Sequence, residues 1–124
     1  MIERLNLRLG ELGILPPAED IPLLEALLER ANFKLLARTG QAVLPEELEG
    51  SAVDMAAGEY LLVRKNTGRL EGFDQDYAIR QMSQGDTSIT YAVEGGVLSP
   101  FEGLIERLRR PPEALVQKWR RMRW

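Results

Sequence analysis

The sequence predicts a mainly α-helical protein. Apolar residues recur at helical spacing through most of the 124 residues, and Pro and Gly residues divide them into about four helices. One stretch differs: Gln84–Tyr91 begins with a turn signal and then alternates β-branched and aromatic residues with small ones. We therefore expect a small helical bundle with a short β-hairpin insertion and a basic C-terminal segment.

Two helices are predicted in the first forty residues. The first covers Met1–Leu12 and ends before Pro16-Pro17. The second covers Asp20–Arg38, with Asp20 as its N-cap and Gly40 just beyond its end. Its apolar stripe is unusually wide, which predicts burial on more than one side. The stripe contains Ile21, Leu23, Leu24, Leu27, Leu28, Ala31, Leu35 and Leu36.

Two further core helices are predicted. One covers Pro45–Lys65, where proline and two glutamates suit the positive end of a helix dipole. Its small residues would let another helix approach closely. The last core helix begins after Ser99, a predicted N-cap, and Pro111-Pro112 ends it. The polar stretch Arg69–Gln81 between these helices is predicted to be a loop leading into a strand.

The β-hairpin is predicted near residues 79–92. Its first strand would cover Ile79–Met82, a turn would follow at Ser83–Asp86, and the second strand would cover Thr87–Tyr91. Because an isolated two-stranded hairpin is only marginally stable, it must complete its own core or pack against a neighbouring copy. Both alternatives are open. The residues expected to share the packed face, and to form the contact between subunits, are Thr87, Ile89 and Tyr91.

The charge distribution divides the chain into a domain, residues 1–110, and a basic C-terminal segment, residues 111–124. Residues 1–106 hold nine Lys and Arg against eighteen Asp and Glu, whereas residues 107–124 hold seven against Glu113 alone. A basic end on an acidic body favours contact with an acidic partner. The candidates are nucleic acid, a membrane surface and acidic protein surfaces, including that of a second copy.

The composition argues against an enzyme. The chain has no Cys and no His, which excludes thiol catalysis and zinc–thiolate sites and removes the commonest general base. Neither an EF-hand spacing nor a phosphate-binding loop is present. No run approaches the ~20 apolar residues of a membrane span, and the N-terminus lacks a signal-peptide pattern. We expect no catalytic residue, no cofactor, no metal and no membrane contact, and synthesis in a cytoplasm.

The basic C-terminal segment has three interpretations. Arg and Trp are enriched at protein interfaces, so it could anchor a partner protein. The same residues could neutralise phosphates and stack on bases. Alternatively, the segment could pack on its own domain or be disordered. The residues predicted to contact a partner are Arg109, Arg110, Leu115, Lys118, Trp119, Arg120, Arg121, Met122, Arg123 and Trp124.

The order of these parts resembles the small head-to-tail connector (adaptor) proteins of long-tailed bacteriophages. The resemblance covers about residues 18–110, and the ordered set of elements carries it rather than any single motif. The elements are the leucine-rich helix at 21–36, Leu-Pro-Glu-Glu-Leu at 44–48, a helix ending in Tyr60-Leu61, the Gly85–Tyr91 stretch and a helix ending in Leu104–Arg110. The first helix and the segment Glu113–Trp124 depart from the family pattern.

The resemblance implies a non-enzymatic subunit of a homo-oligomeric ring, usually a dodecamer, attached beneath the portal protein of the capsid. Such a ring extends the channel through which double-stranded DNA passes without sequence-specific binding, and it docks a stopper or tail-completion protein. In this family the C-terminal segment commonly reaches toward the portal. The implied location is the neck of the virion, after synthesis in the host bacterial cytoplasm. A small nucleic-acid-binding protein and a helical protein-interaction module are the open alternatives.

Overall fold

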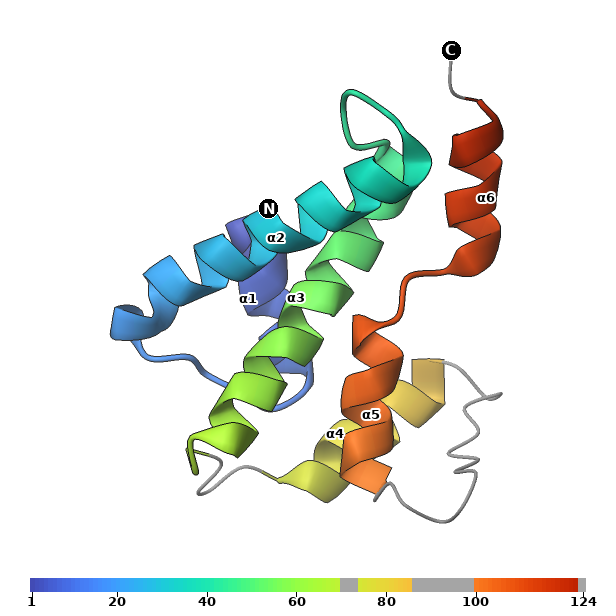
Figure 1. Cartoon of the computed structure of the whole chain (residues 1–124). Helices are drawn as coiled ribbons and strands as arrows, with labels where there is room; N and C mark the ends of the chain where they lie inside the picture. Colours follow the sequence, from blue (N-terminus) through green and yellow to red (C-terminus); the bar gives the residue numbers. More distant parts are fainter. Residues whose placement is uncertain (70–73, 86–99, 123–124) are drawn as a thin grey trace.

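The computed structural model of the chain describes residues 1–69, 74–85 and 100–122, and within these ranges the protein is mainly helical. These residues form six α-helices and one 3₁₀ helix, and α3 lies at the centre of the bundle (Figure 1). Their order is α1 (Ile2–Glu11), η1 (Ala18–Asp20), α2 (Ile21–Thr39), α3 (Glu46–Asn66), α4 (Gln75–Gly85), α5 (Pro100–Arg109) and α6 (Glu113–Arg121). The predicted mainly α class is confirmed.

Small residues explain why α3 lies at the centre. This helix packs against α1, α2 and α5. Ala56, Ala57 and Gly58 lie in its middle and are buried, so neighbouring helix backbones can approach closely. At Gly58 the approach is closest: a Cβ there would lie 2.8 Å from Cγ of Arg109 in α5. The sequence of α3 thus fixes the spacing of the bundle.

The buried apolar side chains form two clusters. The larger one joins α1, α2, α3, α4 and α5 and includes Leu9, Leu24, Tyr60 and Leu104. A second cluster lies where the C-terminal half of α2 meets the N-terminal half of α3, and α6 covers it (Figure 1). Its buried members are Ala31, Leu35, Leu48, Ala52, Met55 and Val116. The C-terminal segment is therefore folded in part onto its own domain.

Helix α2 begins and ends where the sequence predicts, but the predicted N-cap residue makes different contacts. Gly40 ends the helix with a left-handed φ of 72°, which glycine adopts without strain. Asp20 occupies the N-cap position, yet its carboxylate makes no capping hydrogen bond. Its Oδ2 instead accepts hydrogen bonds from Tyr60 Oη at 2.6 Å and Arg69 Nη2 at 2.7 Å. Asp20 therefore ties the start of α2 to the end of α3.

The predicted β-hairpin is wrong at its first strand, and the predicted loop before it is partly wrong. Ile79–Met82 lie inside α4, and the described ranges contain no strand. Asp74 starts this helix, because its Oδ1 accepts a hydrogen bond from the backbone N–H of Tyr77 at 2.9 Å. Ala78 is buried in the main core and Ile79 packs against it, which stabilises the helical conformation. The second strand of the prediction, Thr87–Tyr91, falls outside the described residues.

Candidate functional site

The C-terminal helix α6 is the candidate site, because half of the predicted partner contacts lie in it and three more follow it directly in the sequence. It begins after Pro111-Pro112 and lies beside α2 rather than beside α5, the helix that precedes it (Figure 1). Val116 is 1% exposed, and Leu115 and Trp119 pack beside it on the second core cluster. The indole Nε1 of Trp119 is buried without a hydrogen-bond partner among the described residues. One face of α6 is thus occupied by its own domain.

Polar contacts also hold α6 at both of its ends. In its first turn, Glu113 Oε1 lies 2.8 Å from Nη2 of Arg38 in α2. Toward its last turn, Lys118 Nζ lies 2.5 Å from Glu47 Oε1 of α3. Gln41 Nε2 donates a 2.7 Å hydrogen bond to the backbone oxygen of Trp119. Because both ion pairs are largely exposed, they orient the helix more than they stabilise it.

The C-terminal end of α6 is basic and solvent-accessible. Arg120, Arg121 and Met122 are exposed, and Met122 has 46% of its surface accessible. Neither arginine makes an ion pair with another described residue. The predicted contacts Arg123 and Trp124 follow directly but lie outside the described residues. The structure therefore separates the predicted tail residues Leu115 and Trp119, which pack on the domain, from Arg120, Arg121 and Met122, which are exposed at the end of the helix.

Arg109 is half-buried between α3 and α5. Its Nε lies 2.7 Å from Glu59 Oε1 of α3, and its Nη1 lies 2.9 Å from Glu106 Oε1 one turn earlier in α5. The hydrogen bond to Glu59 is the main cause that raises the pKa of the Arg109 guanidinium. Arg109 therefore links α3 to α5. Arg110, the next residue, is exposed and makes no ion pair within the described ranges.

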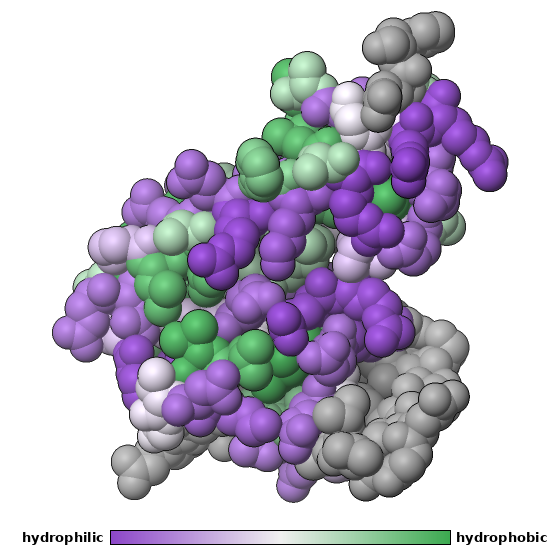
Figure 2. Space-filling view, in the orientation of Figure 1, coloured by the Kyte–Doolittle hydropathy of each residue, from purple (hydrophilic) through white to green (hydrophobic). Residues whose placement is uncertain are grey.

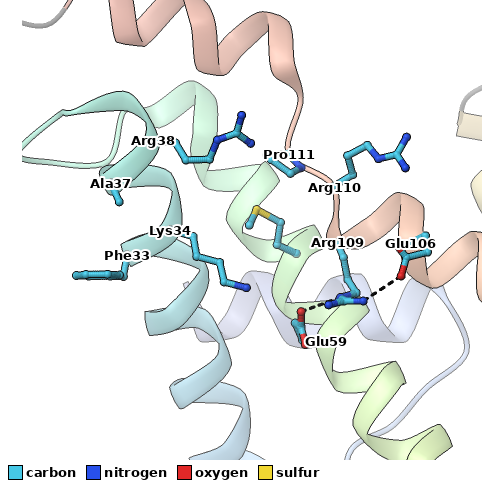
Figure 3. Close-up of a pocket in the computed structure, with 10 residues that line it drawn as sticks. Phe33, Lys34, Ala37, Arg38, Glu59, Glu106, Arg109, Arg110 and Pro111 are labelled. Atoms are coloured by element: carbon cyan, nitrogen blue, oxygen red, sulfur yellow. Dashed lines mark hydrogen bonds and ion pairs between the residues drawn. The ribbon is translucent and has the colours of Figure 1, made fainter.

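A cleft of about 500 Å³ separates α2 from the link between α5 and α6. Met55 and Pro111 contribute apolar lining, and Lys34 and Arg38 reach into the cleft from α2 (Figure 3). Arg109 and its two glutamates line the side toward α5. Phe33, on the outer side of α2, is 71% exposed at the rim. The sequence interpretation missed this cleft, although the four-residue spacing of Lys34 and Arg38 signals a basic helix face.

Substitution of Val116 by Asp is expected to release α6 while the main core stays folded. A carboxylate at this buried position would lose its hydration without gaining a partner. Trp119 would then become exposed, so the tryptophan emission should shift to the red, and a protease should cleave near Pro111-Pro112. Gln117→Asp adds the same charge at the adjacent exposed position and should change neither signal. Equal effects of the two substitutions would contradict this packing of α6.

The side chains at α6 and the cleft are suited to ion pairing and to apolar contact. Within the described ranges, Asp and Glu side chains form no group of three or more that could hold a metal ion. No helix in those ranges is both long and apolar enough to cross a membrane. Comparisons with protein-family models, curated proteins and solved structures found no match to this chain.

Proposed function

We propose that the protein is a structural subunit of a phage head-to-tail connector. In this proposal, copies of the chain form a ring beneath the portal, and the exposed basic end of α6 docks on an acidic surface of the portal protein. The observation that carries the docking role is that α6 is anchored on its own domain while its C-terminal end is basic and exposed. Its inner face is anchored on α2 and α3, while Arg120, Arg121 and Met122 are presented to solvent.

The anchoring of α6 favours a docking role. A helix that is already folded and oriented loses less conformational entropy on binding than a free segment does. Arginine also forms bidentate contacts with carboxylates, and it is enriched among the residues that dominate binding energy. Two arginines that make no ion pair with any described residue, at the end of a pre-folded helix, therefore suit an acidic protein surface.

The charge of the remaining chain suits a channel for DNA. Residues 1–106 carry a net charge of −9, from nine cations and eighteen anions. A channel lined by this acidic body would repel the duplex, so DNA would pass through it without being retained. A stopper or tail-completion protein would occupy the face away from the portal. An assembled ring with a basic lumen would contradict the proposed channel.

The docking role is tested with the full chain carrying Arg120→Glu and Arg121→Glu. We expect binding to the portal protein of the same genome to weaken on the order of tenfold or more, which corresponds to about 1.4 kcal/mol per factor of ten. Point substitutions are preferable to deletion, because loss of α6 would uncover the second core cluster. Affinity can be measured as binding of each variant to surface-immobilised portal rings at a fixed salt concentration. Circular dichroism checks that each variant is folded.

A matched control reverses two arginines elsewhere, Arg4→Glu and Arg80→Glu, which gives the same change in net charge at exposed positions. This control should bind the portal as the unmodified chain does. Equal binding by the Arg120/Arg121 variant would overturn the docking role of α6. Absence of portal binding, together with salt-dependent DNA binding that the same variant abolishes, would instead establish the nucleic-acid alternative.

A further inference from the structure

Helix α2 exposes two sides of opposite charge. Ile21, Glu25 and Glu29 repeat every four residues and form what we term the acidic flank. The basic flank repeats in the same way and consists of Arg30, Lys34 and Arg38. Each residue of the basic flank follows its counterpart in the acidic flank by nine residues. At 3.6 residues per turn, nine residues span about two and a half turns, so the two residues project from opposite sides of the helix. The two flanks therefore lie on opposite sides of the helix, separated by its buried stripe.

The charges of both flanks are available for contact. All six flank residues are exposed, and within the described ranges Glu25, Glu29, Arg30 and Lys34 take part in no ion pair. Only Arg38 is paired, with Glu113. Ile21, an apolar residue with 40% of its surface accessible, lies on the acidic flank. Polar side chains cover most of the face shown in Figure 2, and apolar patches interrupt them.

The cleft adjoins the basic flank. Lys34 and Arg38 extend from α2 over it, whereas Arg109 on the opposite wall is paired with Glu59 and Glu106 (Figure 3). The lining holds four cations against these two carboxylates, so its net charge is positive, and Lys34 of the basic flank and Arg110 are the two cations that make no ion pair within the described ranges. A ligand that combines carboxylates with an apolar side chain would match this lining.

We propose that the acidic flank of one copy docks against the basic flank and cleft of a second copy. This inference rests on the proposed function, because a ring subunit needs a contact between its two sides. The two surfaces are different, so the contact is heterologous and repeats from copy to copy until a ring or filament forms. Because the flanks lie on opposite sides of one helix, consecutive copies would place their α2 helices side by side.

Charge and apolar contact have separate roles in this interface. Exposed ion pairs contribute little affinity each, but they select the partner and its orientation. Apolar contact would come from Ile21 of one copy, which would enter the cleft of the next beside Met55. The docked copy would also bury part of Phe33, which is 71% exposed in the single chain. The basic flank would therefore determine which surface docks, and the cleft would hold it.

The test uses two full-length double variants. Arg30→Glu with Lys34→Glu makes both flanks acidic, and Glu25→Lys with Glu29→Lys makes both basic. We expect each variant alone to be monomeric, because like charges would meet at the contact. An equimolar mixture should self-assemble again as an alternating array of the two variants. Native mass spectrometry and sedimentation velocity at low ionic strength measure both results, and high salt should weaken the assembly of the mixture.

The control reverses two exposed glutamates away from both flanks, Glu3→Lys with Glu46→Lys, which matches the net charge of the second variant. It should self-associate as the unmodified chain does. An unmodified chain that stays monomeric at millimolar concentration and low salt overturns the inference, as does a mixture that fails to assemble. Portal-bound rings that form despite the flank substitutions would overturn the inference but retain the proposed function. Assembly that depends on the flanks, without any binding to the portal, would retain the inference and overturn the proposed function.

Discussion

Substitution of Gly58 by Ala is expected to lower the free energy of unfolding by about 1–2 kcal/mol. The new Cβ would lie 2.9 Å from Cβ of Leu108 and 3.0 Å from the backbone nitrogen of Arg109. These atoms cannot rotate away, so α3 and α5 would have to separate, and overpacking of this kind typically costs about 1–3 kcal/mol. The gain in helix propensity offsets only part of that cost. Thermal unfolding should show Tm lower by about 5 °C.

Gly10→Ala is the matched control for this prediction. Gly10 lies in α1 with no heavy atom within 4 Å of an added Cβ, so alanine meets no obstacle there. This substitution should leave stability unchanged or raise it by up to about 1 kcal/mol, because alanine is the better helix former. If Gly58→Ala were as well tolerated as Gly10→Ala, the close contact of α3 with α5 would be refuted.

Substitution of Asp20 by Ala should lower the free energy of unfolding by about 2 kcal/mol. Asp20 is 7% exposed and Tyr60 is fully buried. Removal of the carboxylate leaves the Tyr60 hydroxyl without its acceptor, and an unsatisfied buried donor costs about 1–3 kcal/mol. Chemical denaturation measures the change. Tyr60→Phe removes the donor as well, so Asp20→Ala should cost much less in a Tyr60→Phe background.

The same pair predicts a dependence on pH. The hydrogen bond from Tyr60, aided by Arg69, holds the pKa of Asp20 below its ordinary value of 3.8. The ionised carboxylate is therefore favoured in the folded state, and its stabilisation is complete above the unfolded pKa and lost as pH falls through the folded one. Asp54 acts in the opposite direction, because burial raises its pKa. Asp20→Asn should therefore flatten the acid limb of the stability curve, and an unchanged limb would contradict this role for Asp20.

Helical periodicity predicted most of the fold because each long helix carries its own apolar stripe. The boundaries of α2 and α3 follow Gly40 and Pro45, which act locally. The sequence predicts loop and strand for the segment 75–85 because it is polar and precedes the turn signal at Ser83–Asp86, whereas the helix is stabilised by packing on distant core residues. Asp74 as an N-cap and the four-residue spacing of Ala78 and Met82 were the signals that could have identified α4.

The candidate site was only partly predictable. Composition indicated that the C-terminal segment is basic, and its helical spacing indicated that Leu115, Trp119 and Met122 lie near one another. Neither composition nor spacing could indicate that α6 covers a second apolar cluster formed by α2 and α3, because that cluster joins residues far apart in the sequence. For the same reason the cleft and the ion pairs of Arg109 emerged only from the fold. The assignments to Thr87, Ile89 and Tyr91 remain predictions.

The most direct test of the connector proposal is electron microscopy of the full chain mixed with the portal protein of its own genome. We expect a closed ring of this protein seated on the portal, with the basic end of α6 at the contact and the α2 helices of consecutive subunits side by side. No complex with the portal, or a complex that lacks a ring of this protein, would contradict the proposal.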